Sequence, residues 1–564
     1  MSLNRIIEYT AVTPSYYALF GSKPKMDRLI KYLKRYSVNE WLSYTSRFCT
    51  TFAVKGVNDD TAQRECLSAV TTKSFAKSLD KWAASLNPQP KYIAIFNERQ
   101  LGIVQQLAML YSPENGASFN SNTTYKDFTR VCMIVNNFLE EKTDLNDIKA
   151  SYVQSMIFSN LYSVSFWTYL VRAQKFYQLD KEYKDPKIRE YLSLFESETG
   201  IDASDFIAGG MCVSLTELNK SLEDHIRGWF HIASPQDDKS IIIARCLNSF
   251  IGFRSATIEE LRSDIGKMDA KFPIESYSLL PLLKKPLVKL SNGLPYVLSA
   301  TGVGRALFDG IYHANLSSAL KEKDKVKKEQ SVRRINGLYG DIFEIYIKAV
   351  LEEIFGNKFF KINQDDFPGF VDFIVIGKSE LLLIEVKSSR FLAREHYRAL
   401  TLLERKVELN ETGLPHALKQ LNKTILAIRE AKQINKDVDG NQIKEFKIIP
   451  ITVTEEFFPS HDFLWEEIYS ESDHSLNYNG KKDNIGYLRM MCVNDLERLE
   501  IPSDPNSLIA SIEKWSFEKG CRTLTFKNFT IEEKIRTDFD FENRHREQTR
   551  EYFLKYVGAD GYRD

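Results

Sequence analysis

The segment that decides the fold is residues 337–389, which read GLYGDIFEIYIKAVLEEIFGNKFFKINQDDFPGFVDFIVIGKSELLLIEVKSS. Residues 341–355 carry apolar side chains at helical spacing, which predicts an amphipathic helix. Two apolar runs follow at residues 370–376 and 381–386, and the residues 377–380 between them favour a β-hairpin. A helix followed by paired strands is typical of an α/β domain.

The hairpin places three charged side chains on one face. Symmetric closure around residues 378–379 sets Asp372 directly opposite Glu385. Side chains directly opposite each other in antiparallel strands have Cβ atoms about 4.5–5.5 Å apart. Because side chains alternate along a strand, Lys387 shares the face of Glu385. The sequence therefore predicts a cluster of two carboxylates and one lysine.

This cluster suits metal-assisted chemistry. Two carboxylates at that separation repel each other, and their burial is costly without a cation. Mg²⁺ binds one or two carboxylates together with water and substrate phosphate, and Mn²⁺ is expected to substitute for it. A lysine beside them can hold a phosphate oxygen or lower the pKa of an attacking water. The pattern predicts hydrolysis of a phosphodiester with Mg²⁺ as the cofactor.

The pattern resembles the PD-(D/E)xK, or restriction-endonuclease-like, nuclease superfamily. Among its branches, the sequence pattern is most similar to the NERD, Mrr and RecB types. The resemblance covers roughly residues 335–455. It implies that Asp372 and Glu385 ligate Mg²⁺ and that Lys387 orients or activates the nucleophilic water. It also implies that Glu344, at the border of the apolar face of the preceding helix, completes the metal shell.

The helix after the second strand carries a further expected catalytic residue. This family often has a glutamine there, and Gln420, in a predicted helix over residues 415–430, takes that place. Two positions differ from the family pattern. Pro368 lies four residues before Asp372 instead of directly before it, and Thr424 stands where a RecB-type motif has tyrosine.

Three arginines between the hairpin and that helix are candidates for contacts with nucleic acid. Arg390, Arg394 and Arg398 are spaced four residues apart, so in a helix they form one stripe suited to backbone phosphates. Glu395 and Glu404 lie among them, and a solvated, ion-paired helix face is the alternative interpretation.

The rest of the chain predicts an α+β multidomain protein. Residues 1–320 are mainly helical, in one or two subdomains, with a recognition or regulatory role expected. A charged junction, KEKDKVKKEQSVRR, spans residues 321–334 and is either a linker or a solvated helix face. An α/β restriction-endonuclease-like domain with a mixed sheet flanked by helices is expected over residues 335–500, and a helical or strand extension over residues 501–564.

Several elements are predicted by their apolar spacing. Helices are expected at residues 26–36, 125–141, 148–179 and 304–320. Buried strands are expected at residues 91–96 and 239–244, with a hairpin over residues 287–299 that turns at residues 291–293. A strand at residues 446–453 is expected to be an edge or bulged strand because of Pro450. Residues 485–493 predict a strand, followed by a helix capped by Asn494 or Asp495.

Composition limits the function classes. The chain has 564 residues, with 76 basic and 76 acidic side chains, so no global positive field attracts nucleic acid. Its seven cysteines include no CxxC pair, which argues against a zinc site or a disulfide framework and favours the cytoplasm. No apolar run is long enough to span a membrane or serve as a signal peptide. No P-loop, GxSxG or HExxH motif occurs.

These observations predict a Mg²⁺-dependent endonuclease that acts on nucleic acid, with DNA favoured over RNA. The resemblance implies a role in prokaryotic restriction or antiviral defence. Whether the chain works with a sensor or other partner protein, and whether it forms a homo-oligomer, are both left open. One alternative is a DNA-repair or mobile-element nuclease that works with a partner ATPase or helicase. The other is a non-catalytic scaffold in which Glu385 and Lys387 form a structural salt bridge.

Overall fold

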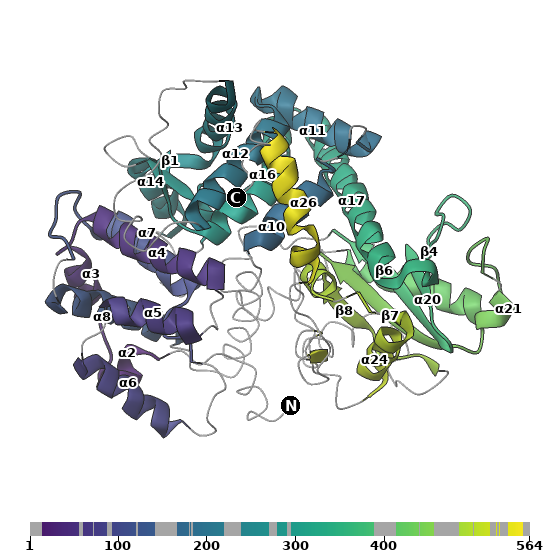
Figure 1. The fold of residues 1–564 in the computed structure, drawn as a ribbon, viewed down its shortest axis with the longest axis horizontal. Coiled ribbons are helices and arrows are strands. Elements are labelled where there is room, and N and C mark those ends of the chain that lie inside the picture. Colours follow the sequence, from purple (N-terminus) through teal and green to yellow (C-terminus); the bar gives the residue numbers. More distant parts are fainter. Residues whose placement is uncertain are drawn as a thin grey trace.

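Figure 1 shows the computed structural model, in which the fold is α+β with a helical N-terminal region, as predicted. The structure describes residues 14–556 apart from several gaps. The longer gaps are residues 141–165, 219–237, 270–278, 389–412, 456–483 and 531–539. The shorter ones are residues 56–59, 71–72, 87–92, 120–121, 180, 182–183, 290–294, 439, 500, 503, 519–525 and 527–528.

Helices make up most of the N-terminal region (Figure 1). They are α2 (Tyr16–Phe20), α3 (Met26–Leu33), α4 (Val38–Lys55), α5 (Asp60–Val70), α6 (Lys73–Ser85), α7 (Glu98–Tyr111), α8 (Asn122–Glu140), α10 (Phe166–Phe176), α11 (Pro186–Thr199), α12 (Ala203–Leu218), α13 (Asp238–Arg254), α14 (Ile258–Asp269), α15 (Leu280–Lys284) and α16 (Ala300–Lys321). The predicted helices at residues 26–36, 125–141 and 304–320 are confirmed. Helix α10 confirms the described part of the one predicted at residues 148–179.

The strand predicted at residues 239–244 is wrong, because this isoleucine-rich segment lies in helix α13. Tertiary packing outweighs the β-propensity of the isoleucines. Helix α13 packs closely against α12 because Gly209 of α12 has no side chain. A Cβ atom at Gly209 would lie 2.0 Å from the carbonyl oxygen of Cys246. The glycine therefore fixes a close helix pair that the local pattern does not reveal.

The strand predicted at residues 91–96 does not form in its described part, where Ile93 makes a β-bridge and residues 94–96 lead into α7 through a bend. A side chain replaces the neighbouring strand. The amide oxygen of Gln63 accepts hydrogen bonds from the backbone N–H groups of Ile95 and Phe96, and its amide nitrogen donates to the carbonyl of Phe96. The buried backbone is thus satisfied without a β-ladder.

The segment of the chain between α13 and α16 forms a small three-stranded sheet. Strand β1 (Ser255–Thr257) runs parallel to β2 (Leu287–Lys289), which pairs antiparallel with β3 (Pro295–Val297). The last two strands confirm the predicted hairpin, and its predicted turn at residues 291–293 lies outside the described residues.

Glu98, at the start of α7, is a buried carboxylate that is expected to make the free energy of unfolding depend on pH. Thr301 donates a hydrogen bond of 3.0 Å to its Oε1 atom, and Oε2 has no partner among the described residues. Burial raises the pKa of Glu98 from 4.5 to about 8, although the Thr301 hydrogen bond lowers it. The folded state therefore binds the proton more tightly than the unfolded state, and stability falls as pH rises from 4.5 to about 8.

We expect Glu98→Gln to remove this pH dependence. The variant should exceed the wild type in free energy of unfolding by an amount that grows between pH 5 and pH 8, to about 2–4 kcal/mol. Urea denaturation at both pH values measures the difference, and Glu114→Gln, at an exposed position, serves as the control. A difference that is the same at both pH values would contradict the expectation.

The long helix α17 (Lys325–Phe355) joins the helical region to the larger sheet (Figure 1). Asp324 caps it, since its side chain accepts a hydrogen bond of 2.9 Å from the N–H of Lys327. The charged segment at residues 321–334 thus supplies the end of α16 and the solvated first turns of α17. One apolar core runs across this segment, from α10, α12 and α16 through α17 to the sheet. A second core lies within α3–α8 and the small sheet.

The larger sheet is mixed and has the order β4-β5-β6-β7-β8. Its strands are β4 (Phe359–Lys361), β5 (Phe373–Ile376), β6 (Glu380–Lys387), β7 (Lys447–Thr454) and β8 (Arg489–Cys492). The first three pair antiparallel, and β6, β7 and β8 run parallel. Side chains on one face pack against α17 and α24 (Pro505–Phe517), and those on the other against α20 (Leu414–Arg429). Short helices η3 (Gly356–Lys358) and α21 (Gly440–Ile443) complete this part.

Two predictions for the end of this domain need correction, the first only in part. Of the two alternatives for the strand with Pro450, edge or bulged, the edge strand is wrong, because β7 lies between β6 and β8. The missing N–H of Pro450 is tolerated where pairing with β8 is interrupted, between the bridge at Ile448 and the ladder that begins at Ile451. Strand β8 and helix α23 (Val493–Glu497) are confirmed, but the N-cap is Cys492, whose N–H donates to the Asp495 carboxylate.

The C-terminal segment contributes helices α24 and α26 (Asp540–Tyr556). Helix α26 packs on α10, where Thr549 donates a buried hydrogen bond of 2.7 Å to Gln174 (Figure 1). The six described cysteines are buried and form no disulfide. Among the described residues, no helix has the length and apolar character needed to cross a membrane.

Candidate functional site

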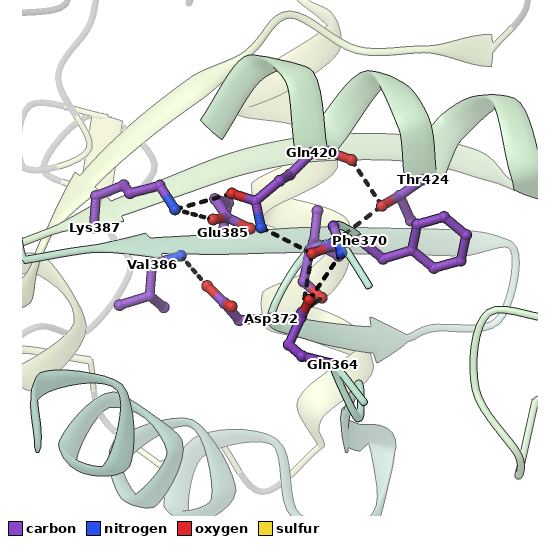
Figure 2. Close-up of polar contacts among 10 residues, drawn as sticks. Gln364, Phe370, Asp372, Glu385, Val386, Lys387, Gln420 and Thr424 are labelled. Carbon is purple, nitrogen blue, oxygen red and sulfur yellow. Dashed lines mark hydrogen bonds and ion pairs between the residues drawn. The ribbon is translucent and has the colours of Figure 1, made fainter. Parts of the chain in front are cut away.

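The β5–β6 hairpin has the predicted register. Phe373 pairs with Ile384 and Ile374 pairs with Leu383. Asp372 lies one residue before this ladder, so its predicted pairing with Glu385 is not part of the ladder. Ile374 and Leu383 pack toward α20, so the alternation of side chains sets Glu385 and Lys387 on that face of the sheet. The hairpin therefore places Glu385 and Lys387 beside α20, while the Asp372 carboxylate reaches the backbone of Val386 (Figure 2).

Asp372 is buried directly before β5. Its Oδ2 atom accepts a hydrogen bond of 2.8 Å from the backbone N–H of Val386, in β6 (Figure 2). Burial and the nearby charge of Glu344 raise the pKa of Asp372 to about 6, although the Val386 hydrogen bond and the charge of Lys387 lower it. This carboxylate is thus anchored to the strand that carries the other predicted site residues.

Glu385 is fully buried in the centre of the sheet, with an exposed fraction of 0%. Lys387 forms an ion pair with its Oε1 atom, while Oε2 has no hydrogen-bond partner among the described residues. Burial and the charge of Asp372 raise the pKa of Glu385 to about 8, against the opposing effect of Lys387. Burial and the charge of Asp372 therefore disfavour the charged form of Glu385 more than the ion pair with Lys387 favours it.

Thr452 of β7 lies beside Glu385 in the parallel ladder and is also fully buried. Its hydroxyl has no hydrogen-bond partner among the described residues. Two unpartnered oxygen atoms thus occur at paired positions of adjacent strands. Burial of polar atoms without partners is costly, and sites of this kind in native proteins commonly bind a ligand, an ion or water.

Gln420 of α20 joins the strand to the loop before β5 (Figure 2). Its amide oxygen accepts a hydrogen bond of 3.0 Å from Lys387, and its amide nitrogen donates one of 3.0 Å to the carbonyl of Phe370. The amide group is oriented by these two contacts, since its oxygen must face the cation. Gln420, which the sequence singled out, therefore holds Lys387 in place.

Two residues of this site were missed from sequence. Thr424 accepts a hydrogen bond of 3.1 Å from the N–H of Val371 and so anchors the backbone next to Asp372 (Figure 2). Gln364 donates to the carbonyl of Phe370 at 3.0 Å and closes the loop. The turn residues Pro368 and Gly369, which has φ of +75°, were a signal for this loop. They did not reveal which side chains hold it.

Glu344 of α17 lies at the edge of the site. Its charge contributes to the raised pKa of both Asp372 and Glu385, but its carboxylate pairs with Lys361 of β4 at 2.8 Å. Within the described part of the chain, no three histidine, cysteine, aspartate or glutamate side chains converge closely enough to hold a metal ion. The structure thus brings Glu344 near the two carboxylates without adding it to their cluster.

The helical region reaches this edge through α11. Lys187 forms an ion pair of 2.7 Å with Asp341 of α17, and its pKa is raised by that contact and by the charge of Glu344. The expected stripe of Arg390, Arg394 and Arg398 lies outside the described residues.

Comparisons with protein-family models, with curated proteins and with solved structures find no match for this chain.

Proposed function

We propose that this protein is a metal-dependent endonuclease that hydrolyses phosphodiester bonds of nucleic acid. The observation that carries the proposal is the unpartnered Oε2 atom of Glu385, buried beside Asp372 and next to a lysine that Gln420 orients. Two buried carboxylates, one cation and one unsatisfied oxygen are costly as a purely structural arrangement. They suit a site that binds a cation and a phosphate.

The donor set fits Mg²⁺. Asp372 and Glu385 offer hard oxygen ligands, and Mg²⁺ commonly uses only one or two carboxylates, with water and phosphate oxygens for the rest. The bound ion would offset the repulsion between the two carboxylates, activate a water molecule and stabilise charge on the phosphate. Glu344 belongs to the proposal as a more distant charge, since its carboxylate pairs with Lys361.

The chain's own residues would then divide the work. Val386 fixes Asp372 through its backbone N–H, and Gln420 holds the ammonium group of Lys387 at the open end of the strand. There Lys387, whose side chain is 20% exposed, would orient the attacking water or bind a phosphate oxygen. Its ammonium group is positioned by its contacts with Gln420 and Glu385.

The test is cleavage of plasmid DNA, and of RNA in parallel, by purified protein with Mg²⁺, Mn²⁺ or EDTA. We expect cleavage with either metal, none with EDTA, and a loss of about 100-fold or more for Lys387→Ala. Lys432→Ala, at a surface lysine paired with Glu430, is the matched control and should cut like the wild type. Equal cleavage by Lys387→Ala, or no cleavage by the wild type with any metal, would contradict the proposal.

The alternative of a non-catalytic scaffold would treat Glu385 and Lys387 as a structural ion pair. That pair does occur, but it leaves one carboxylate oxygen unsatisfied and places Asp372 beside the same carboxylate. DNA as the substrate, and a role in antiviral defence, remain predictions based on the family resemblance.

A further inference from the structure

The exposed face of α20 differs from the rest of this charge-neutral chain. From Leu414 to Leu426 its exposed side chains are those of His416, Lys419, Lys423 and Leu426, so three basic groups occur without an acid. Among the described residues, no carboxylate lies within ion-pair distance of Lys419 or Lys423. A solvated helix face usually carries both signs of charge in ion pairs, and this one does not.

This face of α20 borders the candidate site. His416 and Lys423 lie one helical turn before and one after Gln420, which faces inward and holds Lys387. Burial and the nearby cations Lys387 and Lys419 lower the pKa of His416, which shows that these groups share one region. The basic face thus continues outward from the lysine of the site.

Lys423 also connects α20 to the loop that leads to Asp372. Its ammonium group donates a hydrogen bond to the carbonyl of Pro368 and lies 5.2 Å from the centre of the Phe370 ring. The cation therefore lies at the rim between helix and loop.

We infer that Lys419 and Lys423, with the N–H of the neutral His416 imidazole as a further donor, bind the backbone phosphates that flank the bond to be cut. This inference rests on the proposed function, because it takes Lys387 as the position of the reacting phosphate. The partner is a polyanionic strand, and the contacts carry no base specificity. Local binding of this kind needs no net positive charge on the whole chain.

The test measures binding of a fluorescent oligonucleotide to proteins that all carry Lys387→Ala, so that the strand is not cut. On duplex DNA, adding Lys419→Ala should weaken binding about eightfold at 0.1 M salt, and reduce the slope of log Kd against log salt by about 0.9. Lys419→Arg should restore both values, and Lys432→Ala should leave both unchanged. Single-stranded and duplex DNA, and RNA, are compared because all three present the same phosphates.

The outcomes separate this inference from the proposed function. If Lys419→Ala leaves affinity and salt slope unchanged, or if no oligonucleotide binds, the basic face is not a nucleic-acid surface, whatever the cleavage assay shows. If affinity depends on Lys419 but the wild type cuts no nucleic acid with any metal, the basic face is supported and the proposed function is contradicted. Lys423 is left intact in these proteins because its contact with Pro368 also supports the loop.

Discussion

Replacing Arg172 with alanine is expected to destabilise the protein by about 3–5 kcal/mol. Arg172 of α10 is buried against α23, where its Nε atom donates a hydrogen bond of 2.8 Å to Glu497 and Nη2 contacts the other carboxylate oxygen. Tyr346 of α17 donates to the same carboxylate. Truncation of the arginine would leave the Glu497 charge buried, with the Tyr346 hydroxyl as its one remaining side-chain donor among the described residues.

Urea denaturation followed by circular dichroism measures this loss. Lys187→Ala is the matched control, because it breaks an exposed ion pair between the helical region and α17 and should cost less than about 1 kcal/mol. A double variant, Arg172→Met with Glu497→Leu, should recover most of the loss, since replacing both buried charges removes both desolvation costs. Equal effects of Arg172→Ala and Lys187→Ala would show that the buried pair contributes no more than a surface pair.

The local geometry of the candidate site could be predicted because it depends on short-range rules. The turn between the two strands fixed which residues pair, and the register of Phe373 with Ile384 followed from its length. Helical spacing alone identified the buried face of α17, including Phe343 and Tyr346. The place of Gln420 came from the family resemblance, since no local rule links a helix residue to Lys387.

Contacts between distant segments could not be predicted. The Gln63 side chain takes the role of a neighbouring strand for residues 95–96, and no periodicity in the sequence reveals such a partner. The close approach of α12 to α13 depends on Gly209. The sequence does not show that the carbonyl of Cys246 occupies the space where a side chain at this position would lie. Likewise, a charged run at residues 321–334 has the same composition in a linker and in the solvated start of a helix.

Glu385→Gln is expected to abolish cleavage and, without metal, to make the protein more stable. The glutamine keeps the shape of the side chain and its hydrogen bond with Lys387, but removes a charge that burial and Asp372 both disfavour. Because those two effects outweigh the attraction of Lys387 and raise the pKa of Glu385, we expect a gain of about 1–4 kcal/mol at pH 8. Thermal unfolding in EDTA measures it. Glu380→Gln, at the start of the same strand, should give no gain, since Ser379 donates hydrogen bonds to that carboxylate.

Mg²⁺ is expected to narrow this difference in stability, and that narrowing separates a functional site from a structural ion pair. Mg²⁺ at ten times its Kd should stabilise the wild type by about 1.4 kcal/mol and leave Glu385→Gln unchanged, because ion binding to the native state adds stability by mass action. A structural pair predicts the opposite sign in EDTA: Glu385→Gln would destabilise the protein by leaving Lys387 without its counter-ion, and Mg²⁺ would shift neither protein. The sign of one difference in unfolding temperature, measured with and without metal, therefore tests the role of Glu385 without any knowledge of the substrate.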